Sequence, residues 1–296
     1  MCRTFGLGQP SSPPRPLPGL STAHVFGIET DRGSFVVKRS DSRPDPGSST
    51  LERAARVAGV ATARPIEPPT PAVGYWAELE GGYVRVSEAV VGAPLALPAS
   101  PAVATWLGRT IAVITGLRLD PGVASLGPDA GLAGEAAVRA WATALPGHPA
   151  LAATLREFDQ LVAAAKSSAP PSVLAHRDLN ARNILLAASG PVLLDFDHAG
   201  PATAWAELVH HTFLLACTDL GAEEPDPAVV RAAVRGYLDA GGEPGPAAPD
   251  AFASLLAGLA GWVGINLDNR AVLAQAAASL PPVLDALPRW SRLLAP

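Results

Sequence analysis

Carboxylate and amide side chains gather at the ends of two short apolar runs in the middle of the chain. Asp178 and Asn183 precede the first run, residues 184–186, and Asp195 follows the second, residues 192–194. A short turn joins the runs, so the pattern predicts a hairpin with these polar groups at one end. Unpaired charge beside a core is costly, and turn capping explains isolated acids but not the whole set. The cluster therefore indicates a site for a divalent cation and phosphate groups.

The spacing within this cluster matches a known catalytic pattern. His176, Arg177 and the aspartate that follows them, then four residues and Asn183, reproduce the H-R-D-x-x-x-x-N loop of protein kinases. Asp195 then falls where the metal-binding D-F-G triplet of those enzymes begins. Residue types, spacing and apolar flanks all agree, and a chance match would not produce that agreement.

Bulk properties exclude several other classes of protein. The chain has 296 residues, enough for one large domain or two lobes, and its formal net charge of −5 disfavours a nucleic-acid partner. Its two cysteines cannot form a disulfide framework and fit a reducing compartment. Residues 1–20 lack the apolar stretch of a signal peptide, and polar or helix-breaking residues interrupt the apolar runs 89–108 and 251–267. We therefore expect a cytoplasmic protein without a membrane or nucleic-acid partner.

Lys38 stands at the end of an apolar strand near the N-terminus. Residues 19–30 and 34–39 are predicted to form two strands joined by a turn, a hairpin that can cover phosphates. Only two of the 22 basic residues are lysines, so a lysine indicates a position that needs a compact ammonium rather than a wide guanidinium fork. A solvated lysine at a strand end is the alternative, but the central cluster favours a phosphate contact.

A helix is predicted over residues 51–58, after a linker rich in proline, glycine and serine at residues 41–48. Glu52 is the acid in this helix, and we expect it to pair with Lys38 and hold the lysine against the phosphates. The spacing of Ser49 and Glu52 also matches a capping box, which is the alternative role for this carboxylate.

The order of elements predicts an α+β fold with two lobes. Strands dominate up to residue 89, and a Gly/Pro break at residues 90–94 marks a hinge before Ala/Leu-rich helices. We expect a small N-terminal lobe with an antiparallel sheet over residues 1–91, including an irregular leader at residues 1–18. A larger, mainly helical C-terminal lobe is expected over residues 92–296. Its helices are predicted at residues 103–119, 134–145, 151–166, 203–215, 227–240, 249–269 and 282–294.

The chain resembles the aminoglycoside phosphotransferases and related small-molecule kinases, which have a protein-kinase-like fold. The resemblance covers nearly the whole chain and is strongest at residues 19–25, Lys38, residues 87–89 and residues 176–200. It implies ATP (or GTP) as the phosphate donor and Mg²⁺ as the metal ion. The residue roles that it implies are Ser21, Thr22 and Lys38 at the phosphates, the Ser87 carbonyl and the Ala89 N–H at adenine, Asp178 as the catalytic aspartate, Asn183 and Asp195 as metal ligands, and His176 and Glu207 as supports of the loop.

Three positions depart from the usual pattern of this family. Arg177 stands where many members have glycine, and Glu207 stands where aspartate is usual. Glu207 is also a first-turn acid that a helix dipole would favour, so both of its roles stay open. Asp197 replaces the final glycine of D-F-G and is a candidate for a second metal contact or for a contact with the acceptor. Residues 198–204 are too few for a phosphorylatable activation loop, which indicates a small acceptor rather than a protein.

The expected function is transfer of the γ-phosphate to a hydroxyl group of a small molecule. An antibiotic, aminoglycoside or similar, is the favoured acceptor, in resistance or self-protection. The acids at residues 223–226 and Asp268 could form a pocket for a polycation. Arg182 inside the loop is a poor neighbour for one, which keeps a metabolite alcohol such as a sugar, amino alcohol or nucleoside-like compound as an alternative. A nucleotide-binding pseudokinase is a further alternative, although every catalytic position is filled. The candidate acceptor contacts are Arg182, Asp197, His198 and Asp268.

Overall fold

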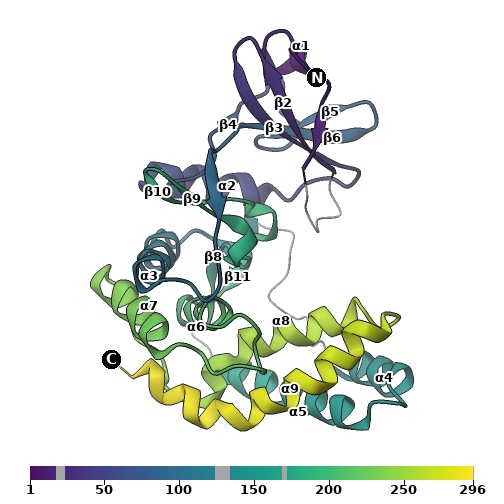
Figure 1. Cartoon of the computed structure of the whole chain (residues 1–296), viewed down its shortest axis with the longest axis vertical. Helices are drawn as coiled ribbons and strands as arrows, with labels where there is room; N and C mark the ends of the chain where they lie inside the picture. The colour runs from purple at the N-terminus through teal and green to yellow at the C-terminus, as the bar shows by residue number, and fades with distance from the viewer. Residues whose placement is uncertain (18–23, 124–133, 169–171, 296) are drawn as a thin grey trace.

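The computed structural model describes residues 1–17, 24–123, 134–168 and 172–295, which form two lobes (Figure 1). The N-terminal lobe is a six-stranded antiparallel sheet in the order β1-β2-β3-β6-β4, with β5 also paired to β6. The predicted N-terminal hairpin, which ends near Lys38, is confirmed as β2 and β3. The predicted α+β architecture with two lobes is confirmed as well. The strands of this sheet are β1 Arg15–Pro16, β2 His24–Thr30, β3 Gly33–Ser40, β4 Pro65–Ile66, β5 Ala77–Leu79 and β6 Gly82–Glu88.

Apolar residues at alternate positions of the strands form the core of the small lobe. Phe35 on β3 and Val86 on β6 are buried on one face of the sheet. Phe5 and Leu7, from the N-terminal segment, pack into the same cluster. Phe5 ends a one-turn helix, α1 Cys2–Phe5. The leader predicted as irregular thus contains a one-turn helix and the two-residue strand β1, and the sheet core holds two of its apolar side chains.

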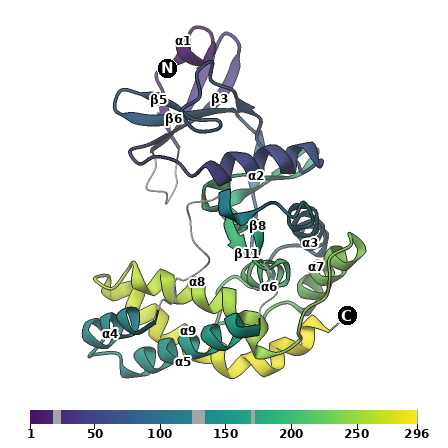
Figure 2. The ribbon, with the colours of Figure 1, turned by 180° about the vertical axis from the view of Figure 1, so that it is seen from behind.

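Helix α2 Pro46–Val57 begins inside the segment predicted as a linker. Asp45 caps the helix by accepting a hydrogen bond from the Gly47 N–H at 2.7 Å. Ser49 is therefore inside the helix rather than at its N-cap, so the alternative capping box of Ser49 and Glu52 is also wrong. Seen from behind, α2 lies between the sheet and the C-terminal lobe (Figure 2).

The C-terminal lobe consists of helices and two small groups of strands. β7 Gly92–Pro94 leads out of the N-terminal lobe and pairs with the central hairpin, which is confirmed as β9 Ile184–Ala187 and β10 Gly190–Leu193. β8 Val173–Ala175 pairs with β11 Gly200–Ala202. The α-helices are α3 Pro101–Gly116, α4 Gly134–Ala144, α5 Pro149–Ser168, α6 Ala204–Leu215, α7 Pro227–Asp239, α8 Ala253–Gly264 and α9 Arg270–Trp290. The 3₁₀ helices are η1 Pro121–Val123, η2 Ala181–Asn183, η3 Phe196–His198, η4 Pro249–Phe252 and η5 Ser291–Leu294.

The last two α-helices differ from the prediction. The helix predicted over residues 249–269 is divided between η4 and α8, which ends at Gly264. α9 begins at Arg270, well before the predicted start, because the Asn269 side chain accepts hydrogen bonds from two main-chain N–H groups at 3.2 and 3.3 Å. Three prolines lie inside α9, and the usual conflict of proline with a helix interior concealed this helix in the sequence.

By length and composition alone, the segment Arg270–Leu294 is long and apolar enough to cross a membrane, because its most apolar 18-residue stretch has a mean hydropathy of 1.2. Its Leu273, Leu280 and Trp290 side chains are buried in the core of the C-terminal lobe. These side chains contact the core of the lobe, and one helix of this length and composition is weak evidence for a membrane span.

Helices α3 and α7 approach each other closely at Gly236. A Cβ atom on Gly236 would lie 2.3 Å from the Thr105 carbonyl oxygen, which belongs to the main chain and cannot rotate away. We expect Gly236→Ala to lower the free energy of unfolding by about 1–3 kcal/mol, because the helices must move apart. Gly261→Ala in α8 is the control, since a Cβ there meets nothing within 4 Å, and it should leave stability equal or slightly higher. Equal stability of the two variants in urea denaturation would contradict the close approach.

Candidate active site

His176 connects the loop after β8 to the end of the central hairpin. Its ring is fully buried, and burial lowers its pKa despite the nearby carboxylates of Glu207 and Asp178, which favours the neutral imidazole. Nε2 donates to the Leu194 carbonyl at 3.1 Å, and Nδ1 accepts from the Asp178 N–H at 3.2 Å. The Leu194 N–H in turn donates to the Asn183 carbonyl at 2.8 Å. The loop and the residue before Asp195 are therefore fixed to each other.

Asp178 and Asn183 form one hydrogen-bonded unit. Asn183 Nδ2 donates to the main-chain oxygen of Asp178 at 2.8 Å and to its Oδ2 at 2.7 Å. Asn180 Nδ2 donates to Asp178 Oδ1 at 2.5 Å. With its Nδ2 directed to Asp178, Asn183 keeps its side-chain oxygen as an acceptor. The Asp178 carboxylate is therefore held in one orientation just before the N-terminus of η2.

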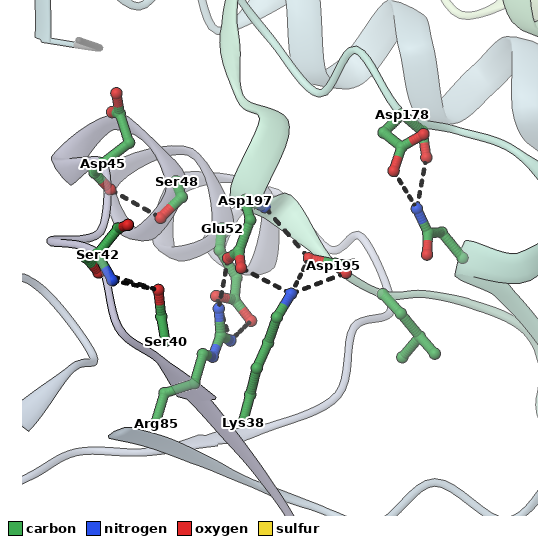
Figure 3. A network of polar contacts seen from close by, with 12 residues as sticks. Lys38, Ser40, Ser42, Asp45, Ser48, Glu52, Arg85, Asp178, Asp195 and Asp197 are labelled. Carbon is green, nitrogen blue, oxygen red and sulfur yellow. Dashed lines mark hydrogen bonds and ion pairs between the residues drawn. The ribbon is translucent and has the colours of Figure 1, made fainter. Parts of the chain in front are cut away.

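Lys38 joins the two lobes across the site (Figure 3). Its Nζ lies 2.8 and 2.9 Å from the two carboxylate oxygens of Asp195 and 2.7 Å from Asp197 Oδ2. Burial works against the charged lysine, but these two carboxylates raise the pKa of Lys38 above its usual value. Burial likewise opposes ionisation of Asp195, yet Lys38 holds its pKa below the usual range. The backbone of Asp195 is left-handed, with φ 55°, a strained conformation of the kind that collects at functional sites.

The predicted ion pair between Lys38 and Glu52 is wrong. Glu52 is almost fully buried and instead accepts two hydrogen bonds from Arg85 Nη2, at 2.9 and 2.8 Å. Arg85 lies directly opposite Lys38 in the register of β3 and β6, and the two cations share one acid, Asp197. Sequence reasoning missed Arg85, although a charged residue between Val84 and Val86 of a buried strand was a usable signal.

Glu207, in the first turn of α6, reaches the loop as the resemblance predicted. Its Oε1 accepts a hydrogen bond from the Arg177 N–H at 2.7 Å, and its Oε2 lies 3.4 Å from His211 Nε2. Arg177 has φ 65°, a left-handed conformation that glycine adopts without strain. The extra methylene of Glu207 relative to aspartate therefore does not prevent the contact with the loop.

This geometry can be compared with known proteins. A family model described as the phosphotransferase enzyme family matches residues 14–252. The chain belongs to the phosphotransferase enzyme family. The predicted family is confirmed, and with it the predicted class of enzyme, a small-molecule O-phosphotransferase. No curated protein matches the phosphotransferase by sequence.

Several solved structures of small-molecule kinases share the fold of this phosphotransferase. A spectinomycin phosphotransferase in complex with ADP and spectinomycin has a TM-score of 0.71 at 12% identity, covering 95% of this chain and 93% of that one. An amicoumacin kinase in complex with AMP-PNP, Ca²⁺ and Ami has a TM-score of 0.71 at 14% identity, covering 97% and 92%. A microcompartment-associated aminopropanol kinase has a TM-score of 0.68 at 15% identity, covering 95% and 92%. At these identities the likeness establishes the fold, which confirms the protein-kinase-like prediction.

Main-chain pairing engages one of the two groups for which the resemblance implies a contact with adenine. The Ala89 N–H donates to the Ser34 carbonyl at 2.9 Å and so extends the ladder between β3 and β6. Ser87 faces Val36 two residues further along this antiparallel ladder, where the same kind of hydrogen bonding recurs. The sheet therefore already uses the Ala89 N–H, so its predicted contact with adenine would require this hydrogen bond to break, and the adenine contacts of Ser87 and Ala89 stay predictions. The phosphate-loop candidates Ser21 and Thr22 lie outside the described residues.

The candidate acceptor contacts are only partly brought together. Arg182 and His198 are exposed on η2 and η3, the two turns that also carry Asn183 and Asp197. Asp268 is exposed in the connection between α8 and α9. Asp197 pairs with Lys38, so it lies in the cluster of Lys38 and Asp195 rather than with these exposed candidates.

Glu223 and Glu224 of the acidic segment line a surface cavity together with Asp285 and Arg289, whereas Asp268 lines a separate one, so the acids predicted to form one pocket for a polycation are not brought together. Glu224 pairs with Arg289 and accepts from Trp290 Nε1 at 2.9 Å, and Glu223 accepts from a main-chain N–H at 3.2 Å. Asp226 caps α7. The segment also follows the C-terminal end of α6, whereas Glu207 contacts the loop near the other end, and a helix of 12 residues is about 18 Å long. These acids are therefore occupied and remote from the loop.

Acid should destabilise the phosphotransferase through Glu207 and His210. Burial opposes ionisation of Glu207, but His211 and the Arg177 N–H hold its pKa at about 2. Because this value is below that of the unfolded chain, the stabilisation is complete above pH 4.5 and is lost as the pH falls towards 2. Burial and the neighbouring His211 lower the pKa of His210 to about 3. The stabilisation that depends on a neutral His210 therefore begins to be lost as the pH falls below 6.5. We expect Glu207 alone to account for about 3 kcal/mol of the fall.

The measurement is the free energy of unfolding from urea denaturation at several pH values between 7 and 2.5. Glu207→Gln should have a shallower fall below pH 4.5 than the wild type. Parallel curves for the two proteins would contradict the contribution assigned to this carboxylate.

Proposed function

We propose that the protein is a kinase that transfers the γ-phosphate of ATP, or of GTP, to a hydroxyl group of a small molecule. The observation that carries this proposal is the contact of Lys38 Nζ with Asp195 at 2.8 Å. It brings the cation of the N-terminal sheet to the acid at the end of the central hairpin. A cation and an acid drawn from the two lobes are what a metal-bound triphosphate needs on its two sides.

The oxygen donors of the site fit Mg²⁺ better than a metal held by protein alone. Among the described residues, no group of three or more His, Cys, Asp or Glu side chains could hold a metal ion. Asp195 and the side-chain oxygen of Asn183 offer oxygen ligands, and Mg²⁺ usually combines one or two carboxylates with phosphates and waters. When bound, this ion would neutralise charge on the phosphates during transfer. Asp195 and Asn183 are thus the proposed ligands, and Asp197 the candidate for a further contact.

Asp178 is the proposed catalytic residue. Its carboxylate orients the acceptor hydroxyl and takes its proton as the oxygen bonds to the γ-phosphorus and the bond to the nucleoside diphosphate breaks. His176 and Glu207 hold the loop that carries Asp178. Lys38 contacts the phosphates of the bound nucleotide. In this structure Lys38 pairs with Asp195 and Asp197 instead.

The acceptor that fits best carries few positive charges. Arg182 and His198 are the exposed side chains beside the cluster, and the acids of residues 223–226 are engaged elsewhere. A less basic antibiotic or an amino alcohol suits this surface better than a polycationic aminoglycoside. The similar structures include kinases of both kinds, since their names specify spectinomycin, amicoumacin and aminopropanol.

Lys38→Met tests the nucleotide site. We expect its affinity for Mg²⁺·ATP to fall by about tenfold or more, because a buried charge-assisted phosphate contact is lost. Lys166→Met is the matched control, since Lys166 is the other lysine and is exposed on α5, and it should bind as the wild type does. Calorimetry with a non-hydrolysable ATP analogue measures both. Equal affinities would contradict the proposed role of Lys38.

A screen for ATP consumption then identifies the acceptor. It should include aminoglycosides, spectinomycin-like and peptide antibiotics, nucleosides, sugars and amino alcohols. Nucleotide binding without turnover for any hydroxyl compound would favour the pseudokinase alternative over an enzyme.

A further inference from the structure

Arg85 stands in the middle of a chain of alternating charges that runs between the lobes. It donates to both carboxylate oxygens of Glu52, and its Nη1 lies 3.7 Å from Asp197 Oδ1. Asp197 Oδ2 is in turn 2.7 Å from Lys38 Nζ. Figure 3 shows the Lys38 and Arg85 side chains side by side, both reaching from the sheet towards Asp197. Arg85 thus contacts both the acid of α2 and an acid of the turn after the hairpin.

Helix α2 makes the pair between Arg85 and Glu52 a link between lobes. Leu51 and Ala55, on the same helix, are buried in the core of the C-terminal lobe, whereas Glu52 faces Arg85 on the N-terminal sheet. α2 also packs against η3, the turn that contains Asp197, and it lies between the lobes in both views (Figures 1 and 2). The ion pair therefore fixes the sheet that carries Lys38 to a helix that belongs to the other lobe.

Arginine suits this position better than a second lysine would. Its guanidinium presents five donors in a planar fork and can bind two carboxylates at once, whereas an ammonium is a point charge. Arg85 and Lys38 are opposite each other on adjacent strands, so both rise from the same face of the sheet. With Glu52 held by Arg85, Lys38 is left to Asp195, Asp197 and the phosphates.

We propose that Arg85 is a positioning residue for nucleotide binding. It takes over the contact with Glu52, and it keeps Asp197 in place when the phosphates draw Lys38 away from that carboxylate. The inference rests on the proposed function, because it concerns the same nucleotide site. It departs from the arrangement expected from the sequence, in which Lys38 alone serves both Glu52 and the phosphates.

Two variants test the inference through nucleotide affinity. The double variant Glu52→Gln, Arg85→Gln leaves no unpaired buried charge, and Arg85→Lys keeps the charge but loses the planar fork. We expect both to bind the Mg²⁺ complex of a non-hydrolysable ATP analogue about tenfold more weakly than the wild type in calorimetry. Arg39→Met is the matched control on the same strand as Lys38. Arg39 is exposed and pairs with the exposed Asp41, so affinity should stay within about twofold of the wild type.

A double-mutant cycle on melting temperature separates the two possible partners of Glu52. Glu52→Gln and Arg85→Gln should have strongly non-additive effects, whereas the coupling between Glu52→Gln and Lys38→Met should be much weaker, because these two residues are linked only through Arg85 and Asp197. Coupling of Glu52 to Lys38 instead of Arg85 would overturn the inference, as would wild-type affinity in both Arg85 variants. A wild type that binds no nucleotide would overturn the inference together with the proposed function. Normal binding by the wild type and by both variants would overturn the inference alone.

Discussion

Replacing Asp178 by alanine is expected to lower turnover by about 10²–10⁴-fold, the usual contribution of a positioned general base. Affinity for Mg²⁺·ATP should change by less than about twofold, because the Asn183 amide keeps its hydrogen bond to the main-chain oxygen of residue 178 and Lys38 makes no hydrogen bond to the Asp178 carboxylate. Steady-state kinetics with the acceptor from the screen gives turnover, and calorimetry gives nucleotide affinity. A loss in kcat without a comparable loss in affinity identifies a group that acts in the transition state.

Asp239→Asn is the control for this experiment. Asp239 is an exposed carboxylate at the end of α7, so its replacement should leave both measurements at wild-type values. Turnover within about tenfold of the wild type in Asp178→Ala would contradict the catalytic role, since a base contributes more than that.

Replacing Arg85 by methionine is expected to lower the free energy of unfolding by about 3–5 kcal/mol, because it leaves Glu52 charged, buried and unpaired. Burial already holds the pKa of Glu52 above its ordinary value, although Arg85 opposes this shift. Without Arg85 the folded-state pKa should rise further. The free energy of unfolding of the variant should therefore be closest to that of the wild type below the pKa of Glu52 in the unfolded chain. The difference between the two proteins should grow as the pH rises. Urea denaturation at pH 5 and pH 8 measures both effects.

Arg64→Met is the matched control for Arg85→Met. Arg64 pairs with Glu88 at 3.2 Å, but both side chains are largely exposed, and exposed pairs contribute about 0–1 kcal/mol. A loss in Arg85→Met as small as the loss in Arg64→Met, or one that does not grow with pH, would contradict the burial and pairing assigned to Glu52.

The predicted central hairpin and loop agree with the structure because their contacts are local. His176 to Asp195 spans one loop and one hairpin, so residue types and spacing nearly determine which groups meet. The hydrogen bond between Asn183 and Asp178 and the link from His176 to Leu194 are contacts of this kind. The apolar alternation of the hairpin places its strands without help from the rest of the chain.

The sequence was least informative where distant segments decide the outcome. Phe5 and Leu7 pack into a sheet core whose strands lie later in the chain, so nothing near them in sequence announces their burial. The Ala89 N–H is used because β6 continues alongside β3 as far as Ser34. The start of α9 depends on the Asn269 cap, and its prolines argue against a helix that tertiary packing stabilises.

The sequence by itself determined the kind of chemistry, because a loop and a hairpin bring Asp178, Asn183 and Asp195 together through short-range geometry. Only the tertiary structure decided which cation each acid receives. Lys38 and Arg85 sit opposite each other on strands that are far apart in sequence, and both can reach carboxylates. The packing of α2 between the lobes places the buried carboxylate of Glu52 beside Arg85. The guanidinium group of Arg85 can bind Glu52 and Asp197 at the same time, so Glu52 pairs with Arg85 and not with Lys38.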